Sequence, residues 1–233
     1  MKPAILCSLL LVLLFSGCLP VVAHSPWLVP GTTAGMEYGY EGAPRPAPDP
    51  DRTGANKALS LGLFLYHNWV QGKDSTGWGA SIGALWRPLT GVQADAFARA
   101  PRLRPLPLDV GAGVMPYGGP MIGWLPYFQV GVPLPGRTYL FTTQGPLTVR
   151  RDYHGVHGMD HPWMSQLGFQ VAATKKGYPG LDLVTFQVGG VFGDMQAHCP
   201  GAHYDCWTPG RYFARMVIAV RVGSWHPQWP GRD

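Results

Sequence analysis

Alternation of apolar with small or polar residues, with a period of two, recurs in eight segments of this 233-residue chain. In 58–70, for example, Leu61, Leu63 and Leu65 alternate with Gly62 and Phe64. Successive side chains of a strand point to opposite faces, so this period predicts β-strands. The 32 glycines and 24 prolines disfavour a helical bundle. We therefore expect an all-β antiparallel protein with strands at 33–41, 58–70, 76–87, 107–117, 121–132, 163–175, 181–193 and 211–225.

The second face of these segments is unusually poor in charge. Only four charged residues, Asp109, Asp182, Arg215 and Arg221, lie among Gly, Ala, Ser and Gln in the seven clearer strands when these are counted over 58–70, 76–86, 107–117, 121–132, 163–173, 181–192 and 212–225. Small polar residues inside and apolar residues outside suit a narrow barrel in lipid. We therefore expect a transmembrane up-and-down β-barrel of eight strands; a secreted or lipid-anchored soluble β-barrel that binds an apolar ligand is the alternative. Tryptophans near strand ends predict aromatic girdles: Trp69, Trp78, Trp86, Trp124, Trp163 and Trp225.

The links between the expected strands alternate in length. Long links at 42–57, 88–106, 133–162 and 194–210 are expected to be outer loops, and the links at 71–75, 118–120 and 176–180 are short. This alternation fits a barrel over 33–225 with both termini in the periplasm. The strand-like stretch 138–149 is interpreted as a hairpin within the third outer loop.

This pattern resembles the small eight-stranded outer-membrane β-barrels of Gram-negative bacteria. The resemblance is one of architecture and covers about 33–225. It implies a location in the outer membrane, with membrane lipid and lipopolysaccharide as neighbours. Such barrels end in an aromatic residue, a position that Trp225 could take, although a C-terminal tail, 226–233, follows it.

The N-terminus has the pattern of a secretory signal peptide over 1–23. Lys2 precedes an apolar run that is too short to span a bilayer as a helix. Small residues at Val21-x-Ala23 favour cleavage after Ala23, which would leave 24–32 as a periplasmic N-terminal segment. The alternative is a lipoprotein box, Phe15-Ser16-Gly17-Cys18, with lipid anchoring at Cys18.

Two of the expected outer loops carry residues that suggest specific chemistry. Cys199 and Cys206 are expected to form a disulfide in an oxidising compartment. No cofactor is expected, apart from a divalent metal for which these loops supply candidate ligands. These ligands are five histidines: His154, His157, His161, His198 and His203.

Basic residues are also concentrated in the expected outer loops. Arginine suits phosphate, and an exported barrel is not expected to meet nucleic acid, so lipopolysaccharide phosphate is the expected partner. The candidate contacts are Arg99, Arg102, Arg104, Arg150 and Arg151, with Arg137 nearby in the chain.

Charged residues on the inner face predict ion pairs within the lumen. Strand 33–41 must pair with 211–225 to close the barrel, which would place Glu37 next to Arg215 or Arg221, with Asp109 as a further partner. The alternative is that each charge is hydrated.

We expect a non-enzymatic protein with a structural, adhesive or narrow-passage role at the cell surface. The alternative is a lipid A-modifying barrel enzyme, an acyl hydrolase or transferase. The chain is similar in size to the lipid A deacylases but lacks their His-x-Ser pairing. His161 and Ser165 share a face, but four residues of strand separate them by about 13 Å, too far for a nucleophile–base hydrogen bond.

Overall fold

The computed structural model describes most of the wall of a β-barrel. The residues it describes are 21–28, 30–42, 57–71, 77–87, 91–103, 107–118, 123–149, 160–172, 181–194, 196–198, 205–207 and 211–222, and at some strand ends only the backbone is described. Among these residues no helix is long and apolar enough to cross a membrane.

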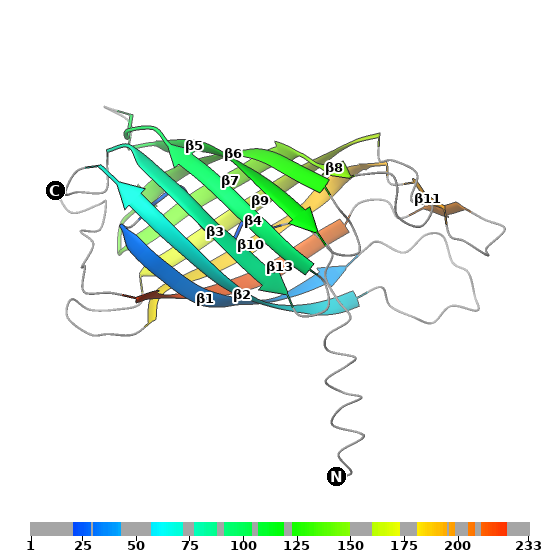
Figure 1. Ribbon diagram of the computed structural model, residues 1–233, viewed down its shortest axis with the longest axis horizontal. Helices are drawn as coiled ribbons and strands as arrows, with labels where there is room; N and C mark the ends of the chain where they lie inside the picture. Colours follow the sequence, from blue (N-terminus) through cyan, green and yellow to red (C-terminus); the bar gives the residue numbers. More distant parts are fainter. Residues whose placement is uncertain are drawn as a thin grey trace, which may run out of the picture.

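The wall is a closed antiparallel barrel of ten strands, each hydrogen-bonded to its two neighbours and inclined to the long axis (Figure 1). Short strand β8 (Thr148–Val149) adds to the start of β6, and β11 (Gln196–His198) pairs with β12 (Asp205–Trp207). In order around the barrel, the wall strands are β1 (Gly31–Gly42), β2 (Lys57–Val70), β3 (Gly79–Arg87), β4 (Gly91–Arg99), β5 (Asp109–Gly118), β6 (Gly123–Leu134), β7 (Thr138–Pro146), β9 (Asp160–Ala172), β10 (Leu181–Asp194) and β13 (Arg211–Val222).

The expected count of eight strands was wrong, because β4 and β7 are also wall strands. In β4 the outward residues are mainly alanines, for example Ala94 and Ala96, so the apolar period is weak. In β7 the polarity is inverted: Tyr139 and Phe141 point inward while Thr142 is only partly buried on the outside. A search for apolar residues on the outer face therefore passes over β4. The strand-like stretch 138–149, which contains β7, was recognised, but its interpretation as a hairpin within an outer loop was wrong, because β7 pairs with β6 and β9 in the wall.

The predicted closure of the barrel is confirmed. Strand β1 pairs with β13 along its length, with Glu37 opposite Val217. In the same register Arg215 lies opposite Gly39 and Arg221 opposite Thr33. The first and last wall strands are therefore neighbours, and the sheet has no free edge.

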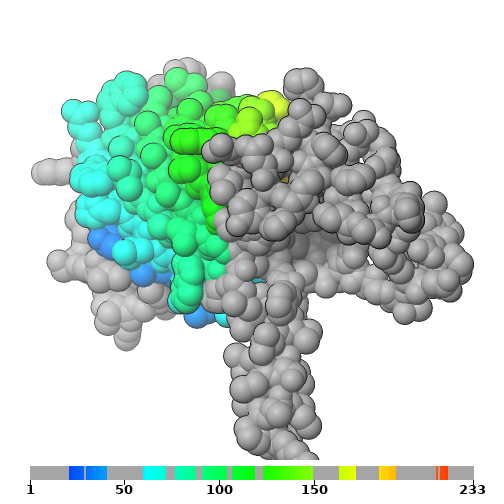
Figure 2. All heavy atoms as spheres, turned by 45° about the vertical axis from the view of Figure 1, so that its right-hand side comes forward, coloured from blue at the N-terminus to red at the C-terminus, as the bar shows by residue number. Residues whose placement is uncertain are grey.

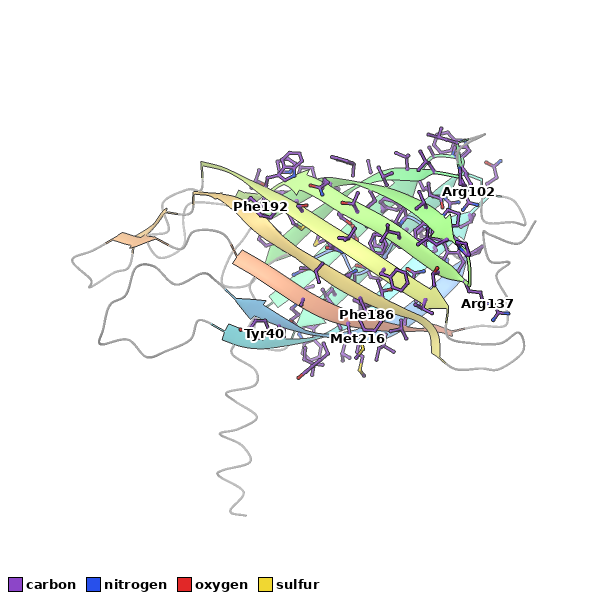
Figure 3. All side chains as sticks on the ribbon, turned by 180° about the vertical axis from the view of Figure 1, so that it is seen from behind. Tyr40, Arg102, Arg137, Phe186, Phe192 and Met216 are labelled. Atoms are coloured by element: carbon purple, nitrogen blue, oxygen red, sulfur yellow. The ribbon has the colours of Figure 1, made fainter. Side chains whose placement is uncertain are left out.

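The ten strands define two ends of the barrel. At the terminal end, where β1 begins and β13 ends, the links are 71–78, 100–108, 135–137 and 173–180. At the opposite end, called the loop end, they are 43–56, 88–90, 119–122, 147–159 and 195–210. Figure 3 shows this separation: Arg102 and Arg137 lie at the terminal end, and Tyr40 and Phe192 lie toward the loop end.

The prediction that 88–106 and 133–162 are each one outer loop was therefore wrong. Segments 88–106 and 133–162 each contain a wall strand, so each is divided between the two ends of the barrel. The short link expected at 118–120 joins β5 to β6 at the loop end, the same end as 43–56. Adding two strands explains both changes, because each extra strand reverses the direction of the chain.

The outer surface of the barrel is apolar. Phe186 and Met216 illustrate how outward side chains project from the wall (Figure 3). On the face shown in Figure 2, the side chains of β2 to β6 form one continuous surface. Large exposed apolar side chains come from β1 to β6, β9 and β10: Met36, Tyr38, Leu61, Leu63, Leu65, Trp69, Ile82, Trp86, Val92, Val114, Trp124, Phe128, Trp163, Leu167, Phe169, Phe186, Val188 and Phe192.

The interior combines glycine with large aromatic side chains, whereas the sequence indicated mainly small polar residues. Phe141 lies against Gly168 on the neighbouring strand, where an added Cβ would come within 2.2 Å of its ring. Phe97 lies against Gly111 in the same way. Inward glycines thus leave room for aromatic rings from adjacent strands, and this pairing fills much of the lumen.

Candidate functional site

A segment of the chain that precedes β1 occupies the lumen of the barrel. This lumenal segment, Val21–Leu28, is buried along its length except for His24, whose side chain is 11% exposed. Val21 contacts Gln93 near the loop end of β4, and Leu28 lies beside Gly79 at the terminal end of β3. The segment therefore runs through the barrel before the chain enters the wall. The expected periplasmic segment 24–32 was wrong, because its first residues lie inside the barrel and its last lie in β1.

Inward glutamines from four wall strands hold the backbone of the lumenal segment. The Nε2 groups of Gln166 and Gln187 both donate to the Val22 carbonyl, at 3.0 and 3.1 Å. Gln129 Nε2 donates to the His24 carbonyl at 2.9 Å, and Gln93 Oε1 accepts from the Val21 N–H at 3.3 Å. All four glutamines are buried. Because a buried polar group is costly without a partner, the segment and the glutamines stabilise each other.

The His24 side chain joins a second polar cluster, centred on Asp95. The Asp95 carboxylate contacts His24 Nε2 at 2.8 Å and accepts from the hydroxyls of Tyr127 and Tyr66 at 2.7 and 3.4 Å. The imidazole also packs edge-on against Tyr66 and tilted against Phe97. This carboxylate therefore fixes the middle of the lumenal segment to three wall strands, β2, β4 and β6.

Two buried ion pairs lie elsewhere in the lumen. Arg87 Nε donates to Glu37 Oε1 at 2.5 Å, and both side chains are almost completely buried. Asp109 accepts from Arg102 Nε and Nη2 at 3.0 and 2.8 Å, and from the hydroxyl of Tyr139 at 2.9 Å. Inward-pointing carboxylates are thus paired, as charges inside a narrow barrel must be.

The partners of these carboxylates differ in part from those expected. Glu37 and Asp109 do lie in the lumen, but the described partner of Glu37 is Arg87, which the sequence analysis did not single out. The side chains of Arg215 and Arg221 lie outside the described residues, so their pairing stays a prediction. Arg87 ends strand β3, whose other inward residues are Gly79, Ser81, Gly83 and Leu85.

Arg99 and Arg102 were predicted to contact lipopolysaccharide phosphate from an outer loop. That prediction was wrong for both, because their side chains are buried in the barrel. Arg99 is completely buried and donates to the carbonyls of Gly77 and Pro26, at 2.7 and 3.4 Å. Arg102 is largely buried against Asp109. Both were placed in an outer loop because β4 was not recognised. Arg104, Arg150 and Arg151 lie outside the described residues.

The structure does not describe the side chains on which the predicted metal site and the predicted disulfide depend, so both stay predictions. These side chains are those of the histidines His154, His157, His161, His198 and His203, and of the cysteines Cys199 and Cys206. Within the described part of the chain, no three His, Cys, Asp or Glu side chains gather closely enough to hold a metal.

Two polar groupings interrupt the apolar outer surface. Near the terminal end, Thr32 Oγ1 and His67 Nδ1 are hydrogen-bonded at 2.9 Å, and the imidazole packs against Trp69. On β7 and β9, Gln144 Nε2 donates to Ser165 Oγ at 2.6 Å, and its Oε1 accepts from Trp163 Nε1 at 2.9 Å. These outward polar groups satisfy one another, which makes them tolerable on an apolar surface.

A small cavity adjoins the lumenal segment. It has a volume of about 50 Å³ and is lined by His24, Trp27, Tyr66 and Gln170 among others. Small-molecule sites typically have volumes of about 300 Å³ or more. The space beside the segment therefore suits a few water molecules, not an apolar ligand.

Sequence reasoning missed the lumenal segment, because its first three residues, Val21 to Ala23, were interpreted as the end of a leader and the rest as a periplasmic segment. The available signal was the set of inward glutamines, Gln93, Gln129, Gln166 and Gln187, on four separate strands. Their amides require partners in the lumen, and a backbone with free carbonyls supplies them.

No protein-family model matches this chain, and its sequence matches no curated protein.

Proposed function

We propose that this protein is a membrane-spanning β-barrel of the outer-membrane type, with a closed lumen and a structural or adhesive role at the cell surface. The observation that carries the proposal is the surface of large exposed apolar side chains contributed by eight of the wall strands, β1 to β6, β9 and β10. Soluble proteins rarely expose such a continuous apolar surface, because water disfavours it. Lipid is the solvent that suits it.

Exposed tryptophans near both ends of the barrel support this proposal. Trp69 and Trp78 lie at the terminal end, and Trp86, Trp124 and Trp163 lie toward the loop end. From Trp78 to Trp86 an extended chain covers roughly 26 Å. Along a strand tilted by about 40°, this corresponds to a height of about 20 Å, which is comparable to the apolar band of about 25 Å, flanked by aromatic girdles, that outer-membrane barrels present to lipid.

The filled lumen favours a structural or adhesive role over that of an open pore. Aromatic rings, two ion pairs and the lumenal segment occupy the interior of the described barrel. A barrel of about this strand number encloses little more than its own side chains. We therefore expect no steady ion conductance when the purified protein is inserted into a planar bilayer; a large constant conductance would contradict the closed lumen.

A charge placed on the apolar surface tests the membrane assignment directly. Leu63, in the middle of β2, is 46% exposed, and Leu103, outside the wall strands, is 51% exposed. In lipid vesicles Leu63→Arg is expected to destabilise the barrel by about 2–4 kcal/mol, because an arginine near the bilayer midplane is costly. The matched variant Leu103→Arg should have little effect.

The measurement is unfolding by denaturant in vesicles, together with gel mobility in SDS before and after boiling. A folded membrane barrel should require detergent for extraction and should migrate differently after boiling. Protein that washes off membranes with carbonate, or equal effects of Leu63→Arg and Leu103→Arg, would contradict the proposal.

A lipid-modifying enzyme remains the alternative function, and one observation bears on it. The Thr32–His67 pair places a hydroxyl and an imidazole in hydrogen-bond contact on the surface that would face lipid. Among the described residues no carboxylate contacts His67, so the third member of a catalytic triad is missing there. Hydrolysis of lipid A by the purified protein, lost in His67→Ala, would support this alternative.

A further inference from the structure

We propose that the lumenal segment, Val21–Leu28, is a permanent part of the mature barrel, so that the leader is removed before Val21 and not after Ala23. The inference depends on the export that the proposed function assumes. It runs against the Val21-x-Ala23 pattern, which by sequence alone favours cleavage at Ala23.

The hydrogen bonds of Val22 are the first argument. Its carbonyl accepts from both Gln166 and Gln187, and each of these buried side chains already has an Oε1 atom without a partner in the described structure. Cleavage after Ala23 would remove this carbonyl and leave two complete amide groups unpaired in the interior. Such a loss is strongly unfavourable, because a buried amide without a partner keeps its full desolvation cost.

The packing of Val21 and Val22 is the second argument. Both are completely buried, and they belong to one apolar cluster with side chains from the wall. Their removal would leave a void lined by apolar groups, which neither water nor the rigid wall can fill without cost. The cluster also contains Leu147 from the link after β7 and, from the wall strands, Phe97, Met115, Tyr117, Leu125, Tyr127, Met164 and Val191.

Charge is the third argument. Cleavage after Ala23 would create an α-ammonium group on His24, within the lumen. Glu37 and Asp109 are each paired with an arginine, and Asp95 already accepts from two tyrosine hydroxyls and contacts the His24 imidazole. An α-ammonium on His24 would have to share the Asp95 carboxylate with these contacts, and a buried cation without a counter-charge of its own is costly. Retention of Val21–Ala23 avoids all three penalties. The lipoprotein box, with cleavage before Cys18, is a processing site upstream of Val21 that would retain these residues.

The N-terminus of the protein purified from membranes tests the inference. Intact-mass measurement and identification of the N-terminal peptide should show a first residue at or before Val21. A chain that begins at His24 would overturn the inference while leaving the membrane assignment intact. Protein recovered only in the soluble fraction would instead contradict the proposed function, so the two failures are distinguishable.

A variant at the disputed site gives a second readout. Ala23→Val places a branched residue where ordinary cleavage needs a small one, and Ala23 borders the small cavity that can take the added methyl groups. If cleavage lies upstream, the mature mass should change only by the substitution itself. Accumulation of a precursor that still carries its leader would show that Ala23 is the processing site, and would overturn the inference.

Discussion

The Glu37–Arg87 ion pair offers the sharpest test of how the lumen stabilises the barrel. Its side chains are 0% and 2% exposed, and Arg87 Nε lies 2.5 Å from Glu37 Oε1. Unit charges about 4 Å apart attract by about 4 kcal/mol at an effective dielectric constant of about 20. Glu37→Gln keeps the shape of the side chain but removes its charge, so it leaves a buried guanidinium without its counter-charge. We expect a loss of about 3–5 kcal/mol in the free energy of unfolding.

The assay is equilibrium unfolding by urea in lipid vesicles, followed by tryptophan fluorescence and by gel mobility. The double variant Glu37→Gln/Arg87→Gln is the control, because it removes both charges and leaves no unpaired ion. It should be less destabilised than Glu37→Gln alone. A loss of less than about 1 kcal/mol for Glu37→Gln, the range of an exposed pair, would refute the assumption of a dry lumen. A double variant that merely adds the two single losses would refute the pairing.

Two further predictions concern the glycine-lined interior and the cysteine pair. Gly168→Ala should destabilise the barrel by about 1–3 kcal/mol, because its Cβ would lie 2.2 Å from the ring of Phe141. Gly118→Ala, whose Cβ would meet nothing within 4 Å, should be tolerated, and equal unfolding curves for the two variants would contradict this packing. Cys199 and Cys206 should be disulfide-linked in protein from its native envelope, and the link should contribute about 2–3 kcal/mol. Mass spectrometry that finds both thiols free would refute the link.

The comparison of β2 with β7 shows why 138–149 was recognised as strand-like but was not assigned to the wall. In β2 the outward residues Leu61, Leu63 and Leu65 are large and apolar, so the period of two is evident. In β7 the large residues Tyr139 and Phe141 face the lumen, and their partners are glycines on neighbouring strands. Which face of a strand is inside depends on its neighbours, and these are known only once the barrel is closed.

The sequence by itself determined the class of the wall and its closure, although not the number of its strands: alternating strands with few charges, an apolar surface, and first and last strands that must pair. Those features follow from the local geometry of a strand and from the need to leave no free edge. Only the tertiary structure decided what fills the lumen. Arg87 pairs with Glu37, Arg99 lies inside, and Val21–Leu28 runs between glutamines of four strands. These contacts join residues far apart in the chain, and no local period encodes which groups meet across an enclosed space.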